Sequence, residues 1–373
     1  MQSVLTSQHY FSEDIFDLEK EQLFKRLWNF VTFRTLLSLP NSFVTREIGG
    51  VSILIQNVSG EIKAFENCCP HRLMPIQQQP FGQSRMVCRY HGWVFDGAGQ
   101  VKTIPNEDEL YCFNQDERNR LCLSQFQVTS IGNLVFVNLS DNPLSIDAQY
   151  SKELQAQLIE VSRHFSDTAI HNNIDVNYNW KLNYENVLDH NHLPYVHPKS
   201  FLPLLRKVKN IEKAQESISK SESFETLLTL SDQSFSSTTP LHIESWPWHS
   251  LVDRYGPGDL YYNFFLFPNI NFISLGGIIF LAQQFQPISA TKTQVRFTLT
   301  TAKEKKRIPA LPAILRGHMK AEVEVLLEDV KFLEAIQSNL HLHSPSVQHG
   351  QYEYRLAAFG NTYKKLLKGD CLW

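Results

Sequence analysis

The sequence lacks the features that nucleic-acid-binding, secreted and membrane-spanning chains share. Its 35 Lys and Arg residues are outnumbered by 38 Asp and Glu residues, so the formal net charge is −3 at pH 7. Binding to nucleic acid or to an anionic membrane needs a basic surplus, and we therefore expect neither partner. No apolar run is long enough to span a membrane, since even Tyr261–Phe280 is broken by Asn, Pro and Gly. The N-terminus has no basic segment leading into an apolar one, so no signal peptide is predicted.

Cysteine is also scarce, with 6 in 373 residues. The missing export signal predicts a cytoplasmic protein, and disulfide frameworks are rare in that compartment. Reduced thiols are free to bind metal. The few cysteines are therefore the first candidates for a functional site.

The chain is long enough for two or three domains. Ser12 is a helix-cap signal, and apolar residues at helical spacing predict a helix over Ser12–Leu37. We assign residues 1–40 to a helical segment that packs with the larger domain. From Ser42 to Leu139, short β-like runs alternate with turn residues such as Gly49–Gly50. This pattern predicts a small, mostly antiparallel β-domain over residues 41–150.

Residues 151–373 mix helical and strand patterns and predict a second domain. The Ser-rich stretch Ala214–Pro240 is predicted to be a mobile loop. The predicted helices are Ser151–His164, Asn179–His192 and Pro309–Leu340, and the predicted strands are Ile243–Ser245, Leu260–Phe267, Ile270–Phe280 and Gln294–Thr301.

The first candidate site pairs cysteine with histidine twice. Cys69-x-His71 is followed, after sixteen intervening residues, by Cys88-x-x-His91. Core packing would explain any one cysteine, but the spacing of the whole set indicates a metal site. Cys68 stands outside the pattern and is assigned to packing.

Zinc and an iron–sulfur cluster both accept two cysteines and two histidines. Tetrahedral Zn²⁺ suits such a set, but zinc fingers place their two cysteines together and their two histidines together. Here each segment supplies one of each. That arrangement suits a [2Fe–2S] cluster of the Rieske type, with thiolates on one iron and imidazoles on the other.

The second candidate site lies in "NYNWKLNYENVLDHNHLPYVHP", Asn177–Pro198. Glu185, Asp189 and His192 share one face if the segment is helical, and His197 follows a break at Pro194. His192 and His197 could converge on one ion with a carboxylate, as in the 2-His-1-carboxylate sites of non-haem iron oxygenases.

The carboxylate ligand must come from elsewhere, and the segment "AEVEVLLEDVKFLEAIQ" offers two candidates. Asp329 is the single charge on an apolar helical stripe, and a lone buried Asp is costly unless it is paired or binds a metal. Glu328 lies on an adjacent stripe. We prefer Asp329, with Glu328 as the alternative.

These strings resemble the two motifs of the Rieske non-haem iron oxygenases. The "CPHR…CRYHGWVFDGAGQ" string is similar to the family's cluster motif, and Asn177–Pro198 is similar to its iron motif. The likeness extends to the N-terminal "YFSEDIFDLEKEQLFKRLWNF" and to the "ED…LEAIQ" helix, so it covers nearly the whole chain. One departure is Leu73, because many members have Gly directly after "HR".

The resemblance assigns a role to each residue of the motifs. It implies that Cys69, His71, Cys88 and His91 bind the cluster, and that His192, His197 and Asp329 bind mononuclear Fe(II). It implies that Asp189 bridges to His91 of a neighbouring subunit and that Glu185 lines the site. The implied fold is α+β, with a small antiparallel β Rieske domain and a larger catalytic domain whose antiparallel sheet is covered by helices in a helix-grip-like arrangement.

The resemblance further implies a terminal oxygenase. Electrons from NAD(P)H would arrive through a ferredoxin or flavin reductase, and O₂ would be used to hydroxylate or oxidatively demethylate a small organic substrate. The chain looks like the homotrimeric branch that includes quaternary-ammonium monooxygenases, with electron transfer between subunits. We therefore prefer a monooxygenase, with an aromatic-ring dihydroxylating dioxygenase as the alternative.

Two other classes of protein remain to be weighed. A Rieske electron carrier would need only the first motif and a much shorter chain, and a zinc-stabilised binding protein would need no iron. The aromatic stretches Ile243–His249 and Tyr261–Phe272 are predicted to line the substrate pocket, where they could enclose a methylammonium group. Core packing of a sheet explains these aromatic residues equally well.

Overall fold

The computed structural model describes residues 2–200, 229–342 and 347–370. The chain forms two compact units, one of Met1–Leu23 with Ser145–Trp373 and the other of Phe24–Leu144. The smaller unit is thus inserted into the larger one. It begins before the predicted residue 41, because residues 29–33 pair with one of its strands.

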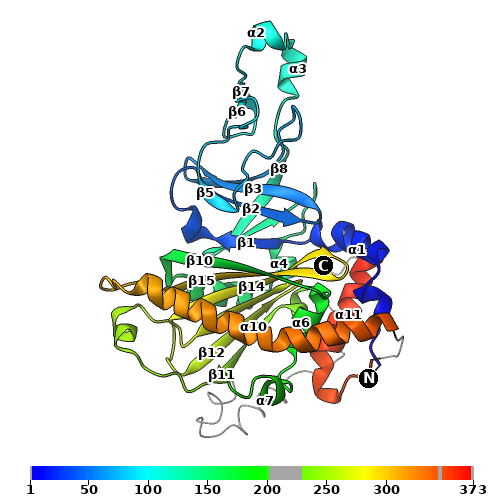
Figure 1. Ribbon diagram of the computed structural model, residues 1–373, viewed down its shortest axis with the longest axis vertical. Helices are drawn as coiled ribbons and strands as arrows, with labels where there is room; N and C mark the ends of the chain where they lie inside the picture. Colours follow the sequence, from blue (N-terminus) through cyan, green and yellow to red (C-terminus); the bar gives the residue numbers. More distant parts are fainter. Residues whose placement is uncertain (1, 201–228, 343–346, 371–373) are drawn as a thin grey trace. The chain divides into compact units, whose positions relative to one another are not determined.

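The smaller unit is built on an antiparallel sheet of seven strands in the order β1-β9-β8-β4-β3-β2-β5 (Figure 1). A separate hairpin, β6–β7, and three short helices complete it. Its strands are β1 (Asn29–Phe33), β2 (Ser42–Ile48), β3 (Val51–Val58), β4 (Glu61–Glu66), β5 (Phe81–Gln83), β6 (Val94–Phe95), β7 (Val101–Thr103), β8 (Gln125–Ile131) and β9 (Leu134–Asn138), and its helices are η3 (Arg34–Leu37), α2 (Glu107–Leu110) and α3 (Gln115–Asn119).

The predicted helix over Ser12–Leu37 is only half right. Ser12 does cap a helix, because its hydroxyl accepts a hydrogen bond from the N–H of Ile15 at 3.4 Å. The helical part consists of α1 (Glu13–Glu19) and the π-helix η2 (Lys20–Phe24), after which the chain enters β1. The β1 sequence NFVTF is fully buried, and its aromatic and β-branched side chains favour a strand.

The larger unit has an antiparallel sheet of six strands in the order β10-β15-β14-β13-β12-β11. The long helix α10 lies across this sheet in Figure 1. The strands are β10 (Phe165–Val176), β11 (Phe235–Pro240), β12 (Leu260–Leu266), β13 (Ile270–Leu275), β14 (Ile279–Ser289) and β15 (Lys292–Ala302). The helices are η1 (Ser7–Tyr10), α1, η2, α4 (Ile146–Gln149), α5 (Lys152–Ser162), α6 (Trp180–Leu188), α7 (Leu193–Val196), η5 (Ser231–Gln233), η6 (Pro247–Leu251), α10 (Leu311–Leu342), η7 (Gln351–Glu353) and α11 (Tyr354–Leu367).

Several predicted elements of the larger unit differ from the observed ones. The predicted loop ends in strand β11, which pairs with β12 from Phe235 to Pro240, while residues 214–228 lie outside the described residues. Residues 243–245 form no strand. The predicted strand Ile270–Phe280 is divided between β13 and β14 by a turn at Gly276–Gly277, where both glycines have positive φ.

The aromatic stretch of β12 divides between two faces of the sheet. Tyr262, Phe264 and Phe272 share one face, because Phe264 is the register partner of Phe272. Phe264 and Phe272 lie with ring centroids 5.3 Å apart, so these residues pack as core. Tyr261 and Phe265 point to the opposite face, where the Phe265 ring lies 6.4 Å from that of His190. Core packing is thus confirmed for Phe264 and Phe272, whereas the pocket role of this stretch stays a prediction.

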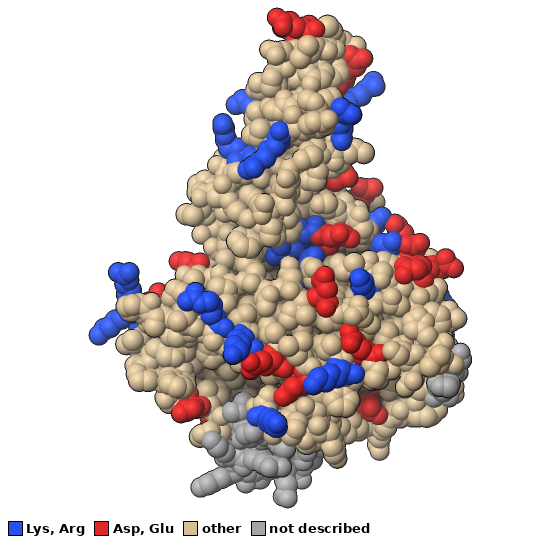
Figure 2. Space-filling view, in the orientation of Figure 1, with Lys and Arg blue, Asp and Glu red and all other residues tan. Residues whose placement is uncertain are grey.

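Acidic and basic side chains are interspersed on the face shown in Figure 2, in agreement with the small net charge. Within the described ranges, no helix combines the length and apolarity that crossing a membrane requires.

Candidate metal centres

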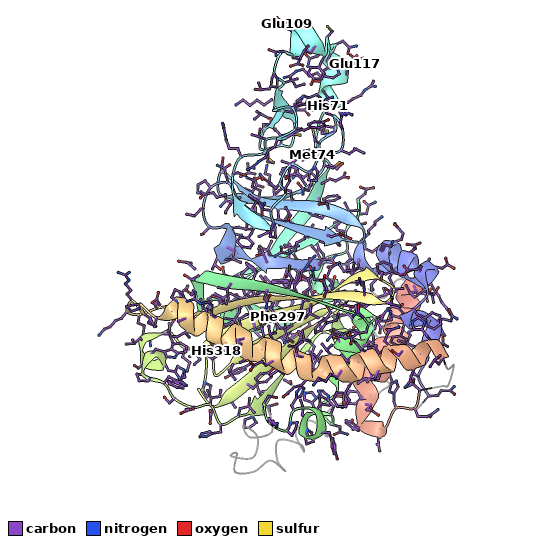
Figure 3. All side chains as sticks on the ribbon, viewed as in Figure 1. His71, Met74, Glu109, Glu117, Phe297 and His318 are labelled. Atoms are coloured by element: carbon purple, nitrogen blue, oxygen red, sulfur yellow. The ribbon has the colours of Figure 1, made fainter. Side chains whose placement is uncertain are left out.

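The four residues of the first motif lie on two loops of the smaller unit that have the same backbone structure. In each loop the cysteine carbonyl accepts a hydrogen bond from the N–H of the fourth following residue, and the cysteine N–H donates to the carbonyl of the fifth following residue. The bonds run from Leu73 N to Cys69 O, from Cys69 N to Met74 O, from Gly92 N to Cys88 O and from Cys88 N to Trp93 O, each 2.9 Å long. Figure 3 labels His71 and Met74 in the first loop.

The tight turn places the fourth residue after each cysteine in the left-handed region. Gly92 has a φ of 74°, which glycine adopts at no steric cost, whereas Leu73 has a φ of 60°. A Leu in this conformation costs about 1–2 kcal/mol. The Leu73 side chain is 75% exposed, so apolar burial does not offset that cost.

The two cysteine side chains are buried and adjacent. Cys69 is 1% exposed and Cys88 is 2% exposed, and both are free thiols. Burial and the neighbouring Cys88 thiol raise the pKa of Cys69 to about 11, so the thiol is protonated when no metal is present. A bound cation would replace this proton and stabilise the thiolate. Cys68 is only half-buried and is not part of this pair.

The two histidines face each other with ring centroids 4.6 Å apart. The His71 ring is stacked on Trp93 at 4.7 Å, which fixes its orientation. Nδ1 of His91 is buried and has no hydrogen-bond partner among the described residues. Such an atom is costly unless it binds something, so two thiols and two imidazoles together fit an iron–sulfur cluster.

The second site brings three side chains of the larger unit together. His192, His197 and Asp329 each offer a ligand atom, and these atoms all lie within 4.8 Å of one another. Oδ1 of Asp329 lies 3.1 Å from Nε2 of His197 and 3.8 Å from Nε2 of His192. That oxygen is buried without a hydrogen bond in the described structure. The three atoms therefore converge on a common point, which is the geometry of a metal site.

The local chain differs from the single helix that the motif predicts. Helix α6 ends at Leu188, and Asp189 follows in an extended conformation with φ −94° and ψ 128°. His192 precedes the first residue of the short helix α7, and His197 follows its last. The predicted shared helical face of Glu185, Asp189 and His192 is thus wrong, because the helix that holds Glu185 ends before Asp189.

Each histidine uses its other ring nitrogen to contact a carboxylate. Nδ1 of His192 lies 3.4 Å from Oδ2 of Asp189, and Nδ1 of His197 lies 2.8 Å from Oε2 of Glu328. Such partners fix the tautomer and leave Nε2 free for a metal. Glu328, the alternative ligand in the sequence, thus lies behind His197 and also accepts a hydrogen bond from Ser200 at 2.5 Å.

The charges of this site favour a bound cation. Burial lowers the pKa of His197, but the carboxylates of Asp329 and Glu328 outweigh burial and raise it overall. Burial likewise opposes ionisation of Asp189, yet its contacts with His192, the Asn191 N–H and Tyr352 lower its pKa. The site therefore retains negative charge that a metal ion can neutralise.

Glu185 lies apart from the three clustered residues. Its carboxylate accepts a hydrogen bond from the Tyr10 hydroxyl at 2.7 Å, and burial raises its pKa to about 7. Beside it, the ammonium of Lys181 (0% exposed) contacts the carboxylate of Glu19 (1% exposed) at 2.5 Å. Tyr363 also donates to Glu19 at 2.5 Å. This network joins the N-terminal segment to α6 and α11, and the apolar pattern of the sequence gave no indication of it.

Two candidate metal sites, one suited to an iron–sulfur cluster and one to a mononuclear ion, define a redox metalloprotein. Residues 28–114 match the model of the Rieske [2Fe-2S] domain, and residues 163–369 match that of the catalytic domain of ring hydroxylating alpha subunits. The second match alone spans more than half of the chain. The chain therefore belongs to the family of Rieske oxygenase alpha subunits, whose two domains imply a [2Fe–2S] cluster and a mononuclear iron.

Relatives in this family include both monooxygenases and dioxygenases. The chain is 35% identical over 157 residues to the hydroxylase alpha subunit of methanesulfonate monooxygenase from Methylosulfonomonas methylovora. This match covers 38% of this chain and 37% of the relative. It is 30% identical over 141 residues to the alpha subunit of benzene 1,2-dioxygenase from Pseudomonas putida, covering 37% of this chain and 31% of the relative. The matched parts are thus about a third of each relative's length.

A solved structure matches the fold over nearly its full length. The quaternary ammonium Rieske monooxygenase CntA in complex with an inhibitor superposes with a TM-score of 0.76, covering 98% of this chain and 95% of that chain at 18% identity. The expected combination of a small antiparallel β-domain with a larger helix-covered sheet is confirmed.

Proposed function

We propose that the chain is the terminal component of a monooxygenase system. Electrons from NAD(P)H would reach it through a ferredoxin or flavin reductase, and O₂ would be the co-substrate. One oxygen atom would enter a small organic substrate, by hydroxylation of a C–H bond or by hydroxylation of a methyl group next to N or O, which is then released as formaldehyde. The second oxygen atom would leave as water.

The convergence of His192, His197 and Asp329 is the observation that carries this proposal. Two imidazoles and one carboxylate leave coordination positions open, unlike the closed four-ligand sites of structural zinc. When bound, the cluster would supply electrons one at a time and the iron would supply O₂ activation.

The protein residues have separable roles in this proposal. Cys69 and Cys88 would bind one iron of the cluster and the imidazoles of His71 and His91 the other. Asp189 would hold the tautomer of His192, as Glu328 does for His197. This function is also compatible with a homotrimer, in which Asp189 would accept a hydrogen bond from His91 of a neighbouring subunit and so connect the two centres.

The composition of the protein after anaerobic purification tests the proposal directly. We expect a visible Rieske spectrum, about three iron atoms and about two sulfides per chain, and NADH-dependent O₂ consumption with a surrogate reductase. A colourless protein with stoichiometric zinc would overturn it. Labelling with ¹⁸O₂ separates the alternatives, because a ring-dihydroxylating dioxygenase, the activity of the benzene dioxygenase relative, would place two labelled atoms in the product.

The role of Asp189 has its own test. Asp189→Asn should keep both metals but slow reoxidation of the cluster in a single turnover by about 10- to 100-fold, since one charge-assisted hydrogen bond is lost. Unchanged reoxidation kinetics would remove Asp189 from the electron path.

A further inference from the structure

Helix α10 carries a second carboxylate in line with Asp329. Glu322 lies seven residues before Asp329, so about two helical turns separate them and both project from the same side of the helix. The rise of the helix places the two side chains about 10 Å apart along its axis. Glu322 is therefore on the side of α10 that carries the candidate iron ligand.

The half-buried carboxylate of Glu322 has no compensating hydrogen bond or cation among the described residues. Within the described ranges it forms no hydrogen bond and no ion pair, although its side chain is half-buried. Burial alone raises its pKa to about 7. By contrast, Glu324 on the exposed side of α10 pairs with Lys320 at 3.7 Å. A carboxylate in these surroundings is costly unless an opposite charge compensates it.

The sheet opposite Glu322 presents electron-rich groups. Tyr261 of β12 lies near enough to Glu322 for the charge of that carboxylate to add to burial in raising the pKa of the phenol. Asn263 follows two residues later on the same face, and its Oδ1 is buried without a hydrogen-bond partner in the part of the chain that the structure describes.

The same face continues toward the iron-ligand segment. Phe265, two residues beyond Asn263, contacts the ring of His190 at 6.4 Å between centroids. The face therefore runs from the Glu322 carboxylate to the neighbourhood of the candidate iron ligands.

Nearby histidine does not supply the missing charge. His318 precedes Glu322 by one turn on α10, where Figure 3 labels it, and Phe297 is labelled on the sheet. Burial lowers the pKa of His318, so it is neutral at physiological pH. The carboxylate of Glu322, the ring of Tyr261 and the amide oxygen of Asn263 thus all favour a positively charged ligand.

We propose that Glu322 is a specificity-determining residue that binds the cationic nitrogen of the substrate, and that the substrate is an alkylammonium compound. This inference rests on the proposed oxygenase function and names its substrate class. A cation beside Glu322 would neutralise the buried charge and contact the face of Tyr261. The spacing of about 10 Å along α10 leaves room for a nitrogen a few ångströms from the carbon to be oxidised.

A pair of ligands that differ only in charge tests the proposal on the iron-loaded protein. Choline and 3,3-dimethylbutan-1-ol have the same shape, but only choline is a cation. We expect choline to bind the wild-type protein at least about tenfold more tightly at pH 8. Glu322→Gln should remove this preference and leave the affinity for the neutral alcohol unchanged. The matched control Glu324→Gln alters the net charge equally and should change neither affinity.

The wild-type protein provides a second readout that needs no variant. Glu322 gains a proton as the pH falls through about 7, so the choline preference should decline from pH 8 to pH 6. The affinity for the neutral alcohol should stay constant. No preference for choline in the wild-type protein, or equal weakening of both ligands by Glu322→Gln, would overturn the proposal.

Failure of the oxygenase function would be seen separately. It would appear as a missing Rieske spectrum or missing iron, both measured before ligand is added. A charge preference in a protein with both metals supports the inference, whereas a metal-loaded protein without the preference contradicts it alone.

Discussion

The two candidate metal sites are built in opposite ways. Every candidate ligand of the cluster site lies between Cys69 and His91, on two loops with matching hydrogen bonds. The iron site draws His192 and His197 from either end of α7 and Asp329 from the middle of α10. One site is thus specified by local turns, whereas the other depends on how distant elements of the larger unit pack.

The largest expected effect is the separate loss of each centre. His197→Ala should remove mononuclear iron and abolish turnover, while the Rieske absorption remains. Cys88→Ala should bleach that absorption and leave the mononuclear iron in place. Metal analysis and electron paramagnetic resonance distinguish the two, and loss of both centres in either variant would contradict their independent construction.

The second-largest expected effect is a loss of stability of the larger unit, caused by breaking the buried Lys181–Glu19 ion pair. Lys181→Met leaves the carboxylate of Glu19 buried without its cation, which should destabilise the larger unit by about 3–5 kcal/mol. Urea denaturation followed by far-ultraviolet circular dichroism measures this cost. The Rieske absorption should persist to higher urea than the loss of helix.

A double variant supplies the control for that prediction. Glu19→Gln combined with Lys181→Met removes both charges and should recover part of the lost stability. If the double variant were as unstable as the sum of the two single ones, the ion pair would not be the cause.

A smaller effect, on iron affinity, is expected from Glu328, which contacts the candidate ligand His197. Glu328→Gln weakens the contact that fixes Nδ1 of His197, so iron affinity should fall by about 10- to 100-fold. Competition with a chelator measures this, with Glu324→Gln as a control on the same helix. Complete loss of iron would instead indicate that Glu328 binds the metal.

The smallest expected effects are changes in the stability of the smaller unit when the equivalent residues Leu73 and Gly92 of the two cluster loops are substituted. Leu73→Gly relieves a left-handed residue and should stabilise the smaller unit by up to about 1 kcal/mol. Gly92→Ala should destabilise it by about 1–2 kcal/mol, because φ is positive and a Cβ would lie 3.1 Å from Cγ of Pro105. Denaturation followed by the Rieske absorption checks both, and shifts of the same sign would refute the equivalence of the loops.

This difference in construction also explains what could be predicted from the sequence. The cluster motif fixes residue types at short spacing, so the sequence brings Cys69, His71, Cys88 and His91 into one small domain. Periodicity likewise predicted α5, α10 and most of β12 and β15, where apolar residues recur regularly.

Features that depend on tertiary contacts were missed. Residues 29–33 carry aromatic and β-branched side chains that favour a strand, but the helical spacing before them extended the predicted helix across them. Their strand form is fixed by pairing with β9. The contact of Glu328 with His197 spans 131 positions, and the sequence offered Glu328 only as an alternative ligand. The buried Lys181–Glu19 pair was invisible because each residue appears as an ordinary surface charge in its own segment.

The inserted position of the smaller unit has a consequence for biosynthesis. Residues before Phe24 leave the ribosome ahead of the smaller unit, but Glu19 can contact Lys181 only after the whole smaller unit has been made. Tyr363, the other partner of Glu19, lies 344 positions after it. The smaller unit of a nascent chain can therefore fold before Lys181 and Tyr363, the partners of Glu19, have been synthesised. A truncation that removes α11 should leave the cluster site of the smaller unit intact and prevent the larger unit from folding completely.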